Sequence, residues 1–309
     1  MGCSPSALRF VVGEYASILA EHGDAFARAK LVTPTSEHFP DEFNRDADSV
    51  LALLERTMSY TPLADDLEVR LGFVEGEAED KGGSCSKPGC GSGGSGWSRV
   101  DGVLDEEDGY RVLVHVADTG TPARLVGSLA RSVGALLSSE AGVPQDADTA
   151  VRCEVWAGAA GFGVLLLGAA HVYSKSCGGV NVHQGTALDV DALATMLALF
   201  CAVRGIKPGK ATSHLAPTPR EAFDEAWQLV DSNRELVRKL REAPELLVGG
   251  AFELEPPKGI LGRLFGRKSE EKAPVSSPRR ERSAEEQRKL DEARALVEDI
   301  FPQNTTPNR

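Results

Sequence analysis

The stretch Arg124–Glu140, RLVGSLARSVGALLSSE, decides the fold class, because its apolar residues recur with the period of an α-helix. One side of this predicted helix is apolar and is expected to pack into a core; it carries Leu125, Leu129, Val133, Leu136 and Leu137. The opposite stripe carries Arg124, Ser128, Arg131 and Ala135. Pro122 stands at the start, where helices favour proline because the first turn needs no backbone N–H donor. The stretch therefore predicts an amphipathic helix at one side of a core.

The remaining pattern predicts an α+β protein that is mostly helical and has a small sheet. Periodic apolar residues predict further helices at Ala7–Lys30, Ala47–Tyr60, Asp189–Arg204 and Thr218–Glu242, with Thr218 as the cap of the last one. Alternating apolar residues predict strands at Leu67–Leu71 and Arg111–Val116. We expect one α+β domain over residues 1–248, a flexible linker over 249–282 and a C-terminal helix over 283–300.

The composition restricts the classes of partner. The 309 residues are 41 % apolar and 26 % charged, which suits a chain with a sizeable core and a charged surface. The formal net charge is −12, so the phosphate backbone of a nucleic acid would be repelled. Aromatic residues make up only 6 %, which leaves few platforms for stacking bases. We therefore expect no nucleic-acid partner.

The segment Val151–Tyr173 meets the length criterion for a membrane span. Its centre, VWAGAAGFGVLLLGAAHVY, contains no Asp, Glu, Lys or Arg. Much of it is Ala and Gly, however, so its hydrophobicity is modest. It also lacks the cluster of basic residues that usually stands at one end of a membrane span. We therefore predict a buried core helix. The short basic amphipathic piece Ile260–Lys268 is similarly interpreted as part of the linker, with contact to a membrane surface as the alternative.

The cysteines and the N-terminus indicate a cytoplasmic protein. Six cysteines are spread along the chain without the density of a disulfide framework, and no secretory signal pattern precedes them. The start Met1–Ser6, MGCSPS, fits a myristoylation pattern, and an ordinary chain end is the simpler interpretation. Cys85 and Cys90 flank a Pro-Gly turn, which is compatible with free thiols, with a disulfide, or with half of a structural metal site.

The order of several short motifs resembles a family of bacterial hypothetical proteins that have a zinc-metallopeptidase-like active helix. The similar segments are LVTPTSEHFPDEF (31–43), the Cys85/Cys90 loop, the strand at 111–116 with the helix from Pro122, AGFGV (160–164), and residues 193–204 with HLAP (214–217). They cover roughly residues 1–245. The resemblance implies a zincin-like core, in which a His-Glu-x-x-His helix binds zinc through its two histidines and uses the glutamate as general base.

The chain departs from that motif at every catalytic position. Arg131 and Ala135 stand in place of the two histidines, and Ser132 stands in place of the general base. Glu154 corresponds to the acidic third ligand of the family. Because a catalytic zinc site needs about three protein ligands, the resemblance implies neither a metal cofactor nor peptidase activity.

The sequence therefore predicts a catalytically inactive metallopeptidase-like protein that binds a protein or a peptide. The candidate binding residues are Arg124, Ser128, Arg131 and Glu154, because arginines in a former catalytic cleft suit a carboxylate or a peptide terminus. A competing hypothesis is an enzyme of different hydrolytic chemistry, built from Glu154 with His171 or His115. Two more hypotheses stay open: a metal site moved to His171, Cys177 and His183, and a membrane-associated scaffold.

Overall fold

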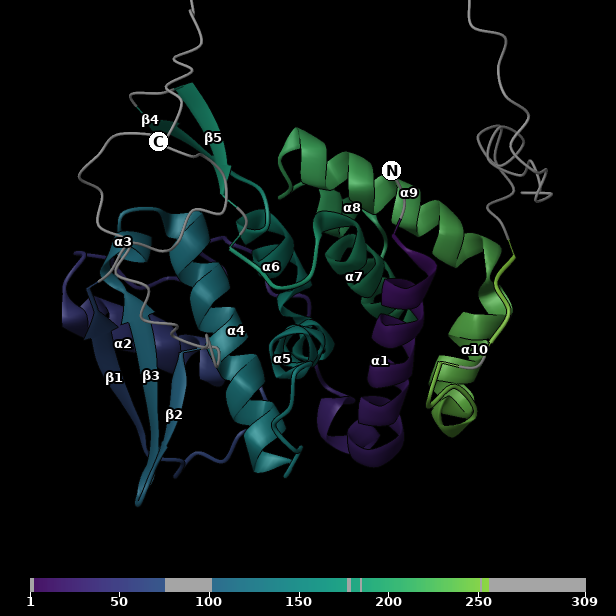
Figure 1. The fold of residues 1–309 in the computed structure, drawn as a ribbon, viewed down its shortest axis with the longest axis horizontal. Coiled ribbons are helices and arrows are strands. Elements are labelled where there is room, and N and C mark those ends of the chain that lie inside the picture. Colours follow the sequence, from purple (N-terminus) through teal and green to yellow (C-terminus); the bar gives the residue numbers. More distant parts are fainter. Residues whose placement is uncertain (1–2, 76–101, 177–178, 184, 251, 256–309) are drawn as a thin grey trace, which may run out of the picture. The chain divides into compact units, whose positions relative to one another are not determined.

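The computed structural model describes residues 3–75, 102–176, 179–183, 185–250 and 252–255, and between Tyr173 and His183 it describes the backbone alone. Within these residues the protein is α+β and mostly helical, as predicted (Figure 1). Predictions that fall elsewhere lie outside the described residues. They concern Gly2, the Cys85/Cys90 pair, Ile260–Lys268, and the helix over 283–300.

Helix α4 (Pro122–Glu140) confirms the helix predicted from its apolar period, with Pro122 in the first turn. Its predicted apolar residues are all nearly inaccessible to solvent. The helix contacts α2 (Ala47–Met58), α5 (Thr149–Ala157), α6 (Gly163–Ala169) and the larger sheet. The contact with α5 is very close, since a Cβ atom at Gly134 would overlap the backbone of Cys153. Helix α4 therefore lies inside the protein rather than along its surface.

The larger sheet has three strands in the order β1-β3-β2. Strand β1 (Val69–Val74) is parallel to β3 (Gly109–His115), and β2 (Val103–Glu106) is antiparallel to β3. Both predicted strands are thus confirmed, each shifted by about two residues. Strand β2 was not predicted, because four residues that end in two acids give little alternation to detect. A second sheet pairs β4 (Val172–Ser176) with β5 (Gly179–His183).

The long apolar segment is buried but is not one regular helix. Helices α5 and α6 are joined by a π-helix at Gly158–Phe162, and the segment ends at Ala169 because β4 begins three residues later. The run Thr149–Ala169 is apolar and long enough to cross a membrane, and 83 % of its apolar window is buried inside the protein. That burial agrees with the predicted core helix.

Gly161 explains the interruption, because its φ of 99° is a left-handed conformation that favours glycine. Its carbonyl accepts a hydrogen bond from the Val32 N–H at 3.0 Å, and a Cβ atom here would overlap the Lys30 carbonyl. The chain after α1 (Pro5–Phe26) therefore runs extended into this kink, which is why the predicted helix over Ala7–Lys30 ends early. The segments 31–43 and 160–164, both singled out from the sequence, therefore meet at this point.

The remaining helices are α3 (Val116–Thr119), α7 (Val190–Arg204), α8 (Gly209–Thr212), α9 (Pro217–Ser232) and α10 (Arg234–Glu242), followed by a 3₁₀ turn at Pro244–Leu246. The prediction of one helix over Thr218–Glu242 was wrong, because the chain leaves helical geometry at Asn233, and the cap position is Ala216 rather than Thr218. The Asn233 side chain accepts from the Glu255 N–H at 2.7 Å and donates to the Glu255 carbonyl at 2.9 Å. These two hydrogen bonds join Glu255 to the start of α10.

Gly161→Ala should lower the free energy of unfolding by about 2 kcal/mol or more, because the left-handed backbone and the Lys30 carbonyl both exclude a Cβ atom. Gly168→Ala is the matched control in α6, where a Cβ atom meets nothing within 4 Å, and it should be neutral or slightly stabilising. Urea unfolding of both variants measures the difference. Equal stabilities would contradict the observed kink.

Candidate functional site

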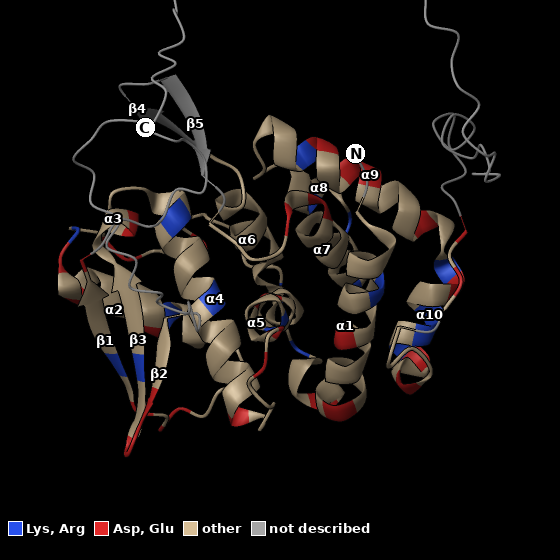
Figure 2. Cartoon of the chain, viewed as in Figure 1, with Lys and Arg blue, Asp and Glu red and all other residues tan. Residues whose placement is uncertain are grey.

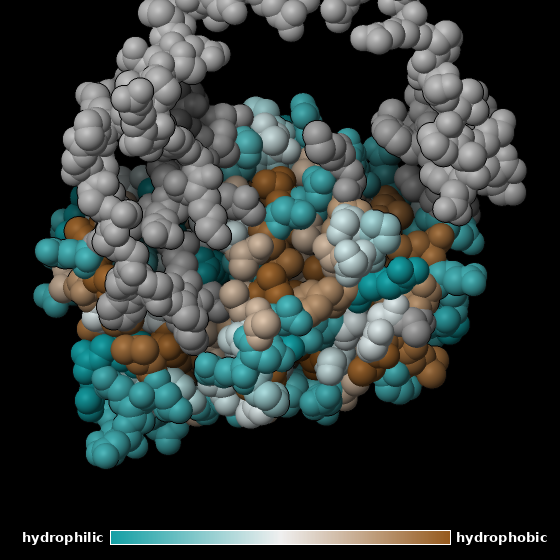
Figure 3. Space-filling model, in the orientation of Figure 1, coloured by the Kyte–Doolittle hydropathy of each residue, from teal (hydrophilic) through white to brown (hydrophobic). Residues whose placement is uncertain are grey.

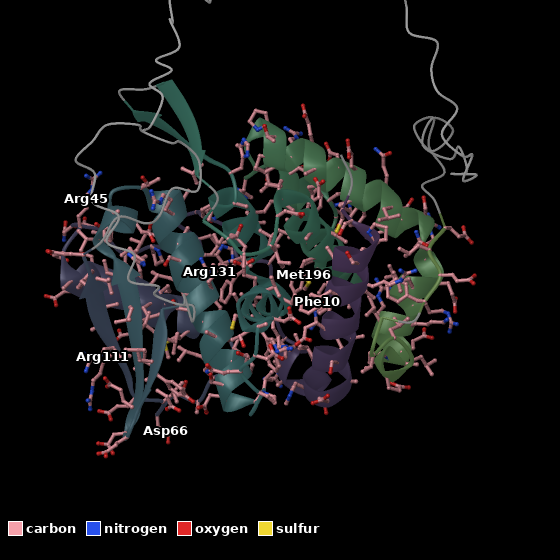
Figure 4. All side chains as sticks on the ribbon, in the orientation of Figure 1. Phe10, Arg45, Asp66, Arg111, Arg131 and Met196 are labelled. Atoms are coloured by element: carbon pink, nitrogen blue, oxygen red, sulfur yellow. The ribbon has the colours of Figure 1, made fainter. Side chains whose placement is uncertain are left out.

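The centre of the candidate site is a buried ion pair between α4 and α5. Arg131 is 8 % exposed and Glu154 is fully buried. Arg131 Nε lies 3.2 Å from Glu154 Oε1, and Arg131 Nη1 donates to the Gly185 carbonyl at 2.6 Å. Arg131 lies on α4, within the protein rather than at its edge (Figure 4). The structure therefore brings together two of the four residues that sequence reasoning proposed for binding.

The Glu154 carboxylate also holds the chain between β5 and α7. It accepts from the Ala187 N–H at 2.7 Å and from the Leu188 N–H at 2.8 Å, one bond to each oxygen. Helix α7 begins directly afterwards, with the Asp189 side chain accepting from the Ala192 N–H at 2.7 Å. The ion pair thus fixes the 185–188 connection to α4 and α5. Its charges are satisfied by the protein's own groups, which is the condition for burying them.

Arg124 and Ser128 occupy the turns of α4 that precede this pair. Arg124 Nη2 lies 2.6 Å from Asp118 Oδ1 of α3, and both side chains are largely buried. Ser128 is half-buried. The stripe is therefore not an open basic surface, because both of its arginines are neutralised by carboxylates of the same chain. Figure 2 shows that blue segments are scattered over several helices and strands rather than gathered on α4.

Ser132 and Ala135, the other two residues that were compared with the motif, are also buried. Ser132 is 1 % exposed and Ala135 is 6 % exposed. Among the described residues no three His, Cys, Asp or Glu side chains are grouped closely enough to hold a metal ion. His171 lies between α6 and β4, His183 is described by its backbone alone, and Cys177 is outside the described residues. His115 is the last residue of β3.

A hollow lies beside the second half of α4 and was not anticipated from the sequence. Residues of β2, β3, α4, α5 and the 141–148 connection line it, among them Val103, Tyr110, Ala135, Ser138, Arg152 and Cys153. Pro144 and Gln145 are exposed at its rim. The sequence carried no signal for this hollow, because its residues come from five separate segments. Glu154, His115 and His171 do not line it, so it offers no support for an enzyme built from them.

Polar groups around the hollow are paired within the chain. The Tyr110 hydroxyl donates to Glu140 Oε1 at 2.7 Å, and partial burial together with that carboxylate raises the pKa of Tyr110 to about 12. Arg152 lies 3.3 Å from Glu14 and 3.1 Å from Asp146. Burial raises the pKa of Glu14 although the Arg152 charge opposes this shift. Tyr110 and Arg152 are therefore paired within the chain, whereas Asp105, which also lines the hollow, is exposed to solvent.

Comparison with known proteins assigns no relative: the chain matches no protein-family model, no characterised protein and no solved structure.

Arg131→Met should lower the free energy of unfolding by about 3–5 kcal/mol, because it leaves the Glu154 carboxylate buried without its cation. The double variant Arg131→Met/Glu154→Gln should recover part of that loss, since no lone charge stays buried. Urea unfolding at pH 7 measures both variants. Arg238→Met, which removes a pair on the surface of α10, is the matched control and should produce no large change. A loss no greater than that of the control would contradict the importance of the buried pair.

Proposed function

We propose that this chain is a catalytically inactive metallopeptidase-like protein that acts by binding a protein or a peptide. The Arg131–Glu154 pair is the observation that carries this proposal. The family resemblance assigns residue 131 to a zinc-binding histidine and residue 154 to the acidic ligand. The two side chains lie within 3.2 Å of each other on adjacent helices, which is the proximity that ligands of one metal ion require.

The chemistry of these residues supports the absence of peptidase activity. A guanidinium stays protonated and has no lone pair for a metal, so Arg131 supplies a cation instead of a ligand. Ser132 has no carboxylate to accept the proton of an attacking water, and Ala135 has no donor atom. The Glu154 carboxylate, which would be a ligand in the family, is directed to a guanidinium and two backbone N–H groups.

The hollow beside α4 is small, with room for about two water-sized groups, so it suits the tip of a short side chain rather than a whole residue. Arg131 and Glu154 are too deeply buried for a partner to reach, whereas the hollow opens at exposed Pro144 and Gln145. Its lining combines apolar side chains with the hydroxyl groups of Tyr110 and two serines. We therefore assign peptide or protein binding to the hollow and an architectural role to the ion pair.

Restoring the two histidines tests the metallopeptidase-like core. The variant Arg131→His/Ala135→His should bind about one zinc ion per chain, with Glu154 as the third ligand, whereas the wild type should bind none after dialysis. Adding Glu154→Gln should weaken zinc binding at least about tenfold. Elemental analysis and calorimetry measure both effects on proteins shown to be folded by circular dichroism. A folded double variant without zinc affinity would contradict the proposed core, and a wild type that carries zinc and cleaves peptides would refute the proposed inactivity.

Selection from a random peptide library on the immobilised protein tests the binding role. Peptides selected on the wild type should lose at least about tenfold in affinity for Ser139→Trp, because an indole would fill the hollow that Ser139 lines. Gln228→Trp, on the exposed outer side of α9, is the control and should bind them unchanged. Peptides that bind both variants equally would show that the hollow is not the site.

A further inference from the structure

The three-stranded sheet has two edges, and they differ in how they are protected. Strand β2 forms one edge, and its outward residue Asp105 is followed by Glu106, Glu107 and Asp108. Charged residues of this kind discourage another strand from pairing there. Figure 2 shows this acidic hairpin in red, and Figure 3 shows the same corner as hydrophilic. Strand β1, with the sequence VRLGFV, forms the other edge and carries only one charge.

The ladder between β1 and β3 determines which backbone groups of β1 point outward. In a parallel pair, the N–H and the carbonyl of one residue point to the same side. The Glu68 carbonyl accepts from the Tyr110 N–H at 2.9 Å, so alternate residues from Glu68 onward bond to β3. Val69, Leu71 and Phe73 therefore direct their N–H and carbonyl groups away from the sheet. No backbone hydrogen bond among the described residues uses these outward groups.

The side chains of β1 also leave this edge apolar and accessible to solvent. Phe73 is 42 % exposed, which is unusual for a large aromatic residue in a strand. The single charge, Arg70, lies on the other face of the sheet, where it pairs with Glu68 at 3.5 Å and with Glu106 at 3.6 Å. Strand β1 has no proline, no lysine and no bulge to prevent pairing. Within the described residues, β1 is thus an apolar edge of six residues that lacks these protective features.

We propose that β1 pairs with β1 of a second copy of this chain, antiparallel and about a two-fold axis at Leu71. In this register Leu71 faces Leu71 of the second copy, and Val69 faces Phe73. Each residue whose backbone groups point outward therefore has an apolar residue opposite it. Arg70 faces Gly72, so no second charge stands opposite it, and the Leu113 and Arg111 side chains already lie over Gly72. A shift in one direction would oppose two Arg70 side chains, and a shift in the other would oppose Val69 and Glu75. The sequence of the strand is therefore complementary to itself in one register.

Sedimentation equilibrium of the full chain over a range of concentrations tests this pairing. The wild type should show a reversible monomer–dimer equilibrium. Phe73→Pro should raise the dimer dissociation constant at least about tenfold, because it removes one outward N–H and the exposed ring while leaving every bond to β3 intact. Phe73→Lys should act in the same direction through charge at the edge.

Asp105→Pro is the matched control, since its N–H points outward from the opposite edge. It should leave the dissociation constant unchanged. Thermal melts of each variant identify loss of folding separately from loss of association. A wild type that stays monomeric up to millimolar concentration would overturn the proposal, as would a Phe73→Pro dimer as stable as that of the wild type. A strand of another protein bound at β1 in place of the second copy would overturn it too.

Discussion

The buried ion pair between Arg131 and Glu154 is the constraint on which the centre of the structure depends. Removing two charges from water costs several kcal/mol unless both are matched by a counter-charge and by hydrogen bonds. The fold meets this condition with groups from three segments: α4 provides the guanidinium, α5 the carboxylate, and the 185–188 connection the backbone partners. These three segments must therefore be assembled together, because removing any one of them would leave a buried charge on another segment without its partner.

Close backbone approach is the second requirement, and glycine provides it at two positions. Gly134 lets α4 lie against α5 near the ion pair, and Gly161 lets the extended chain after α1 enter the kink between α5 and α6. The kink is a π-helical turn, a feature that often marks functional sites in other proteins. Here it positions the N-terminal part of the chain against the core helix. The two glycines and the buried ion pair thus constrain the same helices, α4, α5 and α6.

Under the proposed function, this arrangement would explain how a metal-binding architecture persists without a metal. A zinc ion links its ligands by coordination and so holds helices together. Under the proposed function, an arginine performs the same linkage from within the chain, with its positive charge between the carboxylate and a backbone carbonyl. Such a replacement preserves the packing while it removes the Lewis acid. Binding would then use a different surface, the hollow beside α4, whose lining residues are positioned by the packed helices.

Local patterns were sufficient for the elements with a strong period. Apolar spacing predicted helix α4 and the strands β1 and β3. It also predicted the burial of the apolar segment around Phe162. Strand β2 was not predicted, because these four residues take their extended conformation from pairing with β3 rather than from their own sequence. The break at Asn233 was missed for a similar reason, as its bonds reach to Glu255.

The sequence by itself determined the fold class, the position of α4 and the absence of His and Glu at residues 131, 132 and 135, because each follows from the order of side chains along a short stretch. Only the tertiary structure decided that Arg131 faces Glu154, that Arg124 is neutralised by Asp118, and that β1 is an edge strand of the three-stranded sheet. These facts depend on distances between segments far apart in the chain. Helix crossing and strand order set such distances, and neither is encoded in a local period.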